Sequence, residues 1–182
     1  MGELGVGALT ISEMARRMGV RGPSLYKYFD SLHAVYDQLF ARGLAGHAAA
    51  VDEAVTPRSP GLDRLRAGMC ATVRWAVDNP ALAQLMFWRV VPGFEPSAAT
   101  FEASVEDMAT VRAELAAAVG AGELSAAADS DPAVRLLTVL MSGLISQQFA
   151  NEPGASFETG RFTSQTDEAF DAFVDHYRPE EA

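Results

Sequence analysis

The spacing of the apolar residues is the feature of this sequence that most restricts its fold. In one segment after another they recur three and four positions apart, the period of a helix that buries one face. Nowhere do apolar and polar residues alternate strictly for five or more residues, as they would in a half-buried strand. The sequence therefore predicts an all-α protein. Prolines, glycines and polar runs separate the segments, and beyond residue 60 the expected helices span roughly 61–78, 80–89, 97–119, 132–150 and 165–177.

Residues 9–44 predict two short helices followed by a longer one. Thr10 can cap the first helix, and Gly19 after it suits the left-handed backbone of a tight turn. The second helix begins at Pro23, where the missing N–H costs nothing, and Ser31 can cap the third. Two short helices joined by a glycine turn are the plan of a helix-turn-helix.

The second short helix has one face suited to packing. At about 100° per residue, Leu25 and Phe29 lie on the same side of that helix. We expect both side chains to point inward, against an apolar set made up of Met14, Met18 and Val35.

The opposite face of this helix is suited to contact with a DNA groove. Lys27 could donate to guanine O6 or N7, while Tyr26 could stack on the sugar-phosphate or touch a thymine methyl. Hydroxyl groups nearby are positioned to bind phosphate. The alternative is a pair of surface helices with a solvated polar face. The expected DNA-contacting residues are Thr10, Arg21, Gly22, Pro23, Ser24, Tyr26, Lys27 and Tyr28.

The distribution of charge permits a DNA-facing N-terminus. The whole chain of 182 residues has a net charge of −10, yet residues 1–50 carry +1 and residues 51–182 carry −11. With an acidic body behind a neutral-to-basic head, electrostatics do not exclude a DNA-facing N-terminus. We therefore expect two domains: a helix-turn-helix domain over residues 1–50 and a larger helical domain over residues 51–182.

Three runs of residues carry a family resemblance: LT at 9–10, MARRMGV at 14–20 and PSLYKYF at 23–29. Together they resemble the TetR/AcrR family of one-component transcriptional regulators. The resemblance implies that residues 10–29 form the helix-turn-helix. It further implies a variable ligand pocket and two final helices that dimerise. By this resemblance Gly22, Pro23, Tyr26 and Lys27 match base-facing positions, and Thr10, Ser24 and Tyr28 match phosphate contacts.

The sequence departs from the family pattern in two places. Members normally begin with a longer helix ahead of the Leu-Thr pair, whereas only residues 1–8 precede Leu9 here. We therefore expect a truncated head in which the side chains that this helix would cover lose part of their shield. Leu32 stands where the family usually has a lysine that contacts phosphate, so one phosphate contact is expected to be lost.

Two further sets of residues follow from the helical pattern of the second domain. Wide apolar stripes predict a dimer interface, with closure of an intrachain core as the alternative; the expected residues are Leu137, Leu140, Leu144, Phe170, Phe173, Val174 and Tyr177. Methionine and aromatic side chains predict a pocket for a small apolar effector, oriented by Gln147, Gln148 or Arg89, with ordinary core packing as the alternative. The expected pocket residues are Met69, Trp75, Met86, Phe87, Trp88, Phe101, Met108, Met141 and Gln147.

Catalysis finds little support in the sequence. The three histidines are isolated, and none has the spacing of a metal site. The single cysteine, Cys70, excludes an intrachain disulfide and a thiolate-rich zinc site. We therefore expect no enzyme activity, no cofactor and no metal. Without a signal peptide or a membrane-spanning stretch, the protein is expected in the cytoplasm, with no membrane partner.

The sequence as a whole predicts a homodimeric, ligand-responsive regulator that binds double-stranded operator DNA. We expect a repressor that a small apolar effector releases from its operator. The alternative is a helical small-molecule-binding dimer whose truncated head no longer binds DNA.

Overall fold

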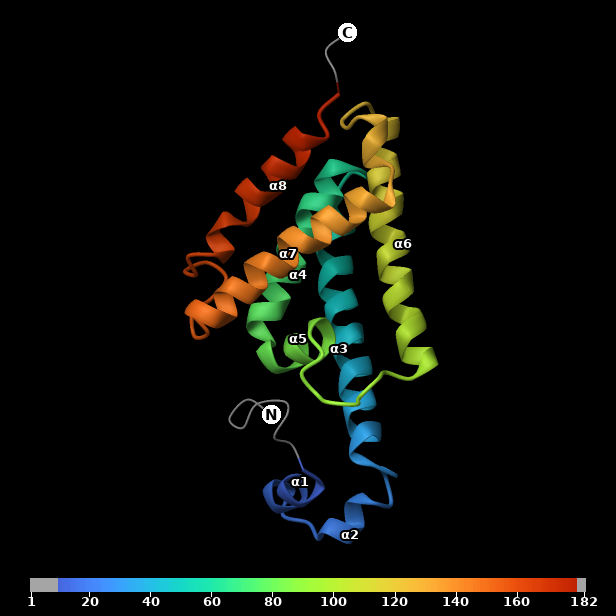
Figure 1. Cartoon of the computed structure of the whole chain (residues 1–182), viewed down its shortest axis with the longest axis vertical. Coiled ribbons are helices and arrows are strands. Elements are labelled where there is room, and N and C mark those ends of the chain that lie inside the picture. Colours follow the sequence, from blue (N-terminus) through green and yellow to red (C-terminus); the bar gives the residue numbers. More distant parts are fainter. Residues whose placement is uncertain (1–9, 180–182) are drawn as a thin grey trace. The chain divides into compact units, whose positions relative to one another are not determined.

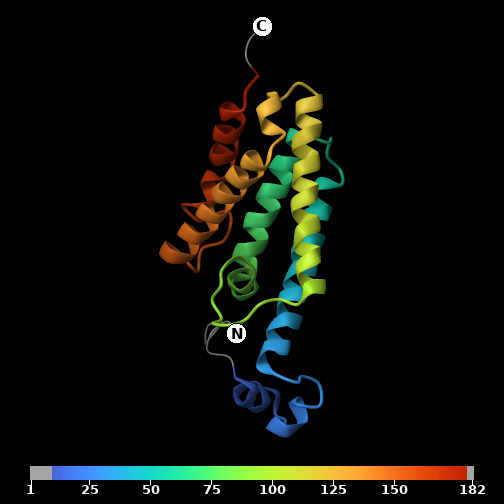
Figure 2. The same cartoon turned by 45° about the vertical axis from the view of Figure 1, so that its right-hand side comes forward.

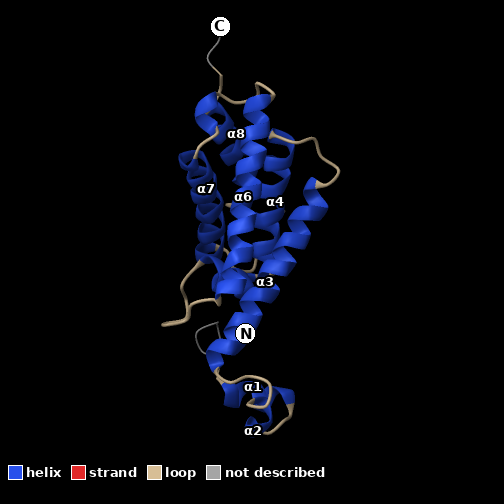
Figure 3. Ribbon diagram, turned by 90° about the vertical axis from the view of Figure 1, so that its right-hand side faces the viewer, coloured by secondary structure: helices blue, strands red, loops and turns tan. Residues whose placement is uncertain are grey.

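The computed structural model describes residues 10–179, apart from the side-chain environment of residues 22, 103, 104, 106 and 107. Throughout this part the chain forms helices joined by loops and turns, with no strand (Figure 3). The expected all-α fold is confirmed. The helices are α1 Ile11–Met18, α2 Gly22–Leu25, α3 Leu32–Val55, α4 Leu62–Asp78, α5 Pro80–Phe87, α6 Ala98–Gly120, α7 Asp131–Asn151 and α8 Thr166–His176, with short 3-10 turns η2 at Ala126–Ala128 and η3 at Thr163–Gln165.

Local sequence signals explain where the helices begin and end. The hydroxyl of Ser31 accepts the N–H of Ala34 at 3.1 Å and so caps α3, as expected. Ser130 caps α7 in the same way, accepting the N–H of Ala133 at 3.3 Å. Gly19 adopts φ 66°, ψ 24° and ends α1, which confirms the expected left-handed turn. Helix α5 ends at Phe87, two residues before the predicted end, because the next residue is already extended.

The chain packs as two compact units. Unit 1 contains the described part of Met1–Ala45 together with Asn79–Ala103, and unit 2 contains Gly46–Asp78 with the described part of Ser104–Ala182. Helices α3 and α6 each contribute to both units. The expected division of function between residues 1–50 and 51–182 stays a prediction, since compact packing does not say which residues bind DNA.

Unit 1 is built around one side of the N-terminal half of α3. Tyr36 and Phe40 are buried there with Leu44, and α5 covers them with Leu85. The loop between α5 and α6 closes this core, since the ring of Phe94 lies 5.7 Å from that of Tyr36 and 6.3 Å from that of Phe40. Residues 79–103 therefore belong to the same packing unit as the start of the chain.

Unit 2 has its own core between α4, α6, α7 and α8. Helices α4, α7 and α8 contact one another along their apolar faces (Figures 1 and 2). Buried residues from all four helices form one cluster, which includes Leu65, Met69, Leu115, Leu137, Phe170, Phe173 and Tyr177.

Arg66 on α4 links α4 to α8 at the edge of this core. Arg66 pairs with Asp167 at 2.9 Å and with Asp171, and its guanidinium lies 4.6 Å from the ring centroid of Phe170. Each contact joins α4 to α8, so a polar edge reinforces the apolar packing of the two helices.

Helix α7 has an unusual surface. Among the described helices it is the one long and apolar enough, by length and composition alone, to cross a bilayer. The sequence had indicated no such stretch, and core helices of soluble proteins pass the same test. Only 22% of its most apolar window is buried within the chain. Most of this window is therefore at least partly accessible to solvent within the chain.

Candidate functional site

The first two helices share a small core of their own. Ile11 and Ala15 of α1 are buried with Leu25 of α2, and Met14 packs partly against them. The N–H of Glu13 donates to the hydroxyl of Thr10 at 3.1 Å, which caps α1 as expected. The predicted inward orientation of Leu25 is confirmed, and the residues around it face outward.

Helix α2 is shorter than predicted. It ends at Leu25, and residues 26–28 form a turn in which the N–H groups of Tyr28 and Phe29 both donate to the carbonyl of Leu25 at 3.0 Å. The expectation of a two-turn helix to residue 29 is therefore wrong. The helix has no side-chain cap and contains a glycine and a proline, both poor helix formers.

The predicted position of Met18 is also wrong. Its side chain is 65% exposed instead of packed against Leu25 and Phe29. Val20, in the turn that follows, is 42% exposed, whereas Val35 of α3 is buried as expected and Phe29 is half-buried.

The predicted DNA-contacting residues lie at the surface of the head. Tyr26 is 59% exposed and Tyr28 is 79% exposed, with Lys27 exposed between them. The surroundings of Gly22 are not described. The other exposed members of the predicted set are Thr10, Arg21, Pro23 and Ser24. Each is accessible to a duplex, and its contact with DNA stays a prediction.

A charge cluster on α1 was not anticipated from the sequence. The carboxylate of Glu13 accepts from Nε of Arg16 at 2.8 Å, from Nη2 of Arg16 at 2.6 Å and from Nε of Arg17 at 2.7 Å. These hydrogen bonds lower the pKa of Glu13 to about 2. The spacing of three and four residues was the available signal, because such positions are neighbours on a helix surface.

The predicted dimer residues lie largely inside this chain. Leu137, Phe170, Phe173 and Tyr177 are buried in the core of unit 2. The remaining residues of the set are half-buried against that core: Leu140, Leu144 and Val174. For the four buried side chains the alternative interpretation, an intrachain core, is the one that the structure bears out. Dimerisation through this set of residues stays a prediction.

In unit 2 the predicted pocket residues occupy different environments. Met69 is 2% exposed within the core cluster, where Met141 packs against it. Trp75 is buried, and its ring lies 5.5 Å from that of His47. Met108, by contrast, is 42% exposed. These side chains do not line one common surface within unit 2.

The other predicted pocket residues belong to unit 1. Met86 is half-buried against α3, where a side chain at Gly43 would come within 2.5 Å of its sulfur. The rings of Phe87 and Trp88 lie edge to face at 5.9 Å, and Phe101 is 58% exposed. The effector role of the whole set stays a prediction.

Comparison with known proteins shows what this arrangement of helices belongs to. Residues 65–177 match the family model described as "Tetracyclin repressor-like, C-terminal domain". The chain belongs to the TetR family of transcriptional regulators. A search among curated proteins gave no match.

Solved structures of similar fold accompany this TetR family assignment. PfmR, a TetR family transcriptional regulator from Thermus thermophilus, is 20% identical, with 96% of this chain and 92% of that chain covered and a TM-score of 0.75. A protein of unknown function from Rhodococcus sp. RHA1 is 23% identical (98% and 89% covered, TM-score 0.76). The transcriptional regulator FadR from Bacillus subtilis, solved in complex with stearoyl-CoA, is 13% identical (94% and 90% covered, TM-score 0.74). At these identities the likeness shows the fold.

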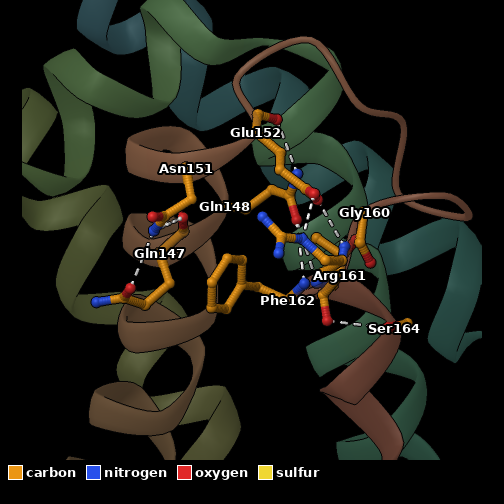
Figure 4. Close-up of polar contacts among 9 residues, drawn as sticks. Gln147, Gln148, Asn151, Glu152, Gly160, Arg161, Phe162 and Ser164 are labelled. Atoms are coloured by element: carbon orange, nitrogen blue, oxygen red, sulfur yellow. Dashed lines mark hydrogen bonds and ion pairs between the residues drawn. The ribbon is translucent and has the colours of Figure 1, made fainter.

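The loop between the last two helices of this TetR family chain is held by a buried glutamine (Figure 4). Gln148 is 1% exposed, and its Oε1 accepts from the N–H of Phe162 at 3.3 Å and of Thr163 at 3.4 Å. Its Nε2 donates to the carbonyl of Glu152 at 2.8 Å. The amide of Gln148 is thus engaged within the chain, whereas the neighbouring Gln147 is exposed and bonded to Asn151.

No metal centre is found among the residues that the structure describes, since no three His, Cys, Asp or Glu side chains gather there in a suitable group. Cys70 is half-buried on α4, and burial raises the pKa of its thiol. A protonated thiol is a weak nucleophile, so the raised pKa disfavours attack by this thiol.

Proposed function

We propose that this TetR family regulator is a ligand-responsive repressor. It binds operator DNA as a homodimer through residues 10–29, and a small apolar effector releases it. Family membership supports the regulatory role. The observation that carries the DNA-binding part is the exposed run from Tyr26 to Tyr28, which stands at the surface while Leu25 beside it is buried.

In this proposal Lys27 reads base edges and the hydroxyl groups hold the backbone. An exposed lysine is long enough to donate to guanine in the major groove, where each base pair shows a distinct pattern of acceptors. The hydroxyls of Thr10, Ser24 and Tyr28 donate to phosphate, which fixes register without reading sequence. Thr10 can do so while it caps α1, because its oxygen accepts the N–H of Glu13 and its hydrogen stays available.

Dimerisation follows from the geometry of DNA, since two heads must meet successive major grooves about 34–36 Å apart. The face proposed for it is the open side of α7, where Arg135, Val139 and Gly143 follow one another at helical spacing. Val139 is 64% exposed, and a side chain at Gly143 would meet nothing within 4 Å. A second copy could therefore approach the backbone of α7 closely.

The effector is proposed to be small and largely apolar, because methionine and aromatic side chains form adaptable apolar surfaces. FadR, which shares the fold, was solved with stearoyl-CoA. This makes stearoyl-CoA the first compound to test here. Release requires only that the effector bind more tightly to the form of the protein whose heads do not fit the operator.

A gel-shift titration on the DNA that flanks the protein's own gene tests the DNA-binding part. Replacing Lys27 by alanine should cost about 1–3 kcal/mol on the operator and relax base preference. Tyr28→Phe is the matched variant, and it should weaken operator and random DNA alike because phosphate contacts carry no sequence information. If each variant loses the same affinity for operator DNA as for random DNA, Lys27 does not read bases.

The second candidate is a small-molecule-binding dimer whose head does not bind DNA. The exposure of Met18 at 65% and of Val20 at 42% favours it, because these side chains of the head lack apolar cover. A thermal shift on adding effector, without any gel shift of DNA, would identify this function. A gel shift that the effector abolishes would identify the repressor.

A further inference from the structure

The outer face of α1 carries a cluster of three charged residues. Ile11 and Ala15 turn one face of the helix to the core. At about 100° per residue, Glu13, Arg16 and Arg17 all lie near the opposite face. The first helix of a helix-turn-helix crosses the DNA backbone, so charges on its outer face lie within reach of phosphate.

Glu13 binds both arginines at once. Two contacts of 2.8 and 2.6 Å engage Nε and Nη2 of Arg16, and a third of 2.7 Å engages Nε of Arg17. Burial does not hold Arg16, because its side chain is 70% exposed; the side chain of Arg17 is 38% exposed. The guanidinium group of Arg16 can therefore turn to another anion without unpacking the helix.

The pairing matters because the head has few positive charges. Residues 10–45 contain five basic side chains, of which two are Arg16 and Arg17. Residues 51–182 carry a net charge of −11 and add no attraction for DNA. A carboxylate that occupies two of five cations thus withholds a large share of the charge that phosphate would meet.

We propose that Glu13 acts as an internal competitor for phosphate. In the free protein it holds Arg16 and Arg17; on DNA the two guanidinium groups exchange its carboxylate for backbone phosphates, to which arginine binds in the same bidentate manner. Glu13 therefore keeps the sequence-independent part of the affinity low, so that more of the binding depends on base contacts. This inference rests on the proposed DNA binding.

Glu13→Gln tests the proposal, since it removes the negative charge and keeps the size of the side chain. Binding to a short duplex of arbitrary sequence is measured over a range of salt concentrations. We expect about three- to tenfold tighter binding, since exposed ion pairs are weak, and a log–log salt slope steeper by up to about two. Asp30→Asn is the matched control, because it removes the same charge from an exposed position of the same unit.

Arg16→Gln and Arg17→Gln complete the experiment. Combined with Glu13→Gln, the two changes should abolish the gain in affinity. In the otherwise unchanged protein they should weaken binding and flatten the salt slope, a readout that does not require the Glu13 variant to fold.

Unchanged or weaker binding by a folded Glu13→Gln protein overturns the proposal, and so does an equal gain from Asp30→Asn. Failure of the proposed function looks different, because the protein would then show no preference for operator over random DNA.

Discussion

Replacing Gly160 by alanine should break the polar cluster that holds the loop between α7 and α8. A Cβ at Gly160 would lie 2.5 Å from Oγ1 of Thr163 and closer still to Oε1 of Gln148. Real Cβ atoms do not come so near, so the buried amide of Gln148 must move. Its oxygen then leaves the N–H groups of Phe162 and Thr163, which it now binds at 3.3 and 3.4 Å.

The magnitude follows from the hydrogen bonds lost. Each buried donor left unsatisfied costs about 1–3 kcal/mol, so with two donors the free energy of unfolding should fall by about 2–6 kcal/mol. For a chain of this size, each 1 kcal/mol lowers Tm by about 2–4 °C, so Tm should drop by about 4–24 °C. The measurement is urea and thermal denaturation followed by circular dichroism at one fixed protein concentration.

Gly154→Ala is the matched control for this experiment. Gly154 lies in the same loop, and a Cβ there would meet nothing within 4 Å, so stability should change by less than about 0.5 kcal/mol. A Gly160→Ala protein as stable as the control would refute the argument. In a protein that already carries Gln148→Ala, the Gly160→Ala change should lower the free energy of unfolding clearly less than it does in the unchanged protein. The side chain of Gln148, with which the new Cβ would clash, is then absent.

Three further perturbations test other parts of the fold. Ser130→Ala removes the cap that accepts the N–H of Ala133 and should lower the free energy of unfolding by about 1 kcal/mol, measured by urea denaturation. Leu25→Ala should cost about 2–5 kcal/mol and melt the small core of the head, seen as faster hydrogen exchange in α1 with α4 to α8 unaffected. The backbone N–H and guanidinium of Arg161 lower the pKa of Glu152. The ionised carboxylate of Glu152 therefore stabilises the loop fully above the ordinary pKa of a glutamate, and this stabilisation is lost as the pH falls through the lowered pKa. Proteolysis of the loop should accelerate in acid. Glu152→Gln should remove this pH dependence.

Helix positions beyond residue 60 could be predicted because the spacing of apolar residues and the helix-breaking prolines and glycines are local properties of the chain. The length of α2 could not, since a helix this short with no side-chain cap has little local signal to mark where it ends. The exposure of Met18 was not predicted either, because periodicity alone does not say which residues of a face are covered. Glu13 and its arginines were readable in principle from their spacing.

The partner of an apolar face is harder to predict than the face itself. The stripe with Phe170 and Phe173 was identified correctly as a packing surface. Hydrophobic burial is not directional, so the stripe could not reveal whether its partner was a second copy or α4 of the same chain. Gln148 poses the same difficulty for a polar residue, because its partners come from a loop that no periodicity describes.

The way unit 1 is assembled limits how the proposed DNA-binding part can be studied in isolation. A fragment cut after residue 50 would keep Tyr36 and Phe40 but lose Leu85 and Phe94, which cover them. Such a peptide would expose aromatic rings to water and tend to aggregate. A soluble fragment for DNA-binding assays would have to include residues 79–103, joined to the N-terminal segment by a short linker.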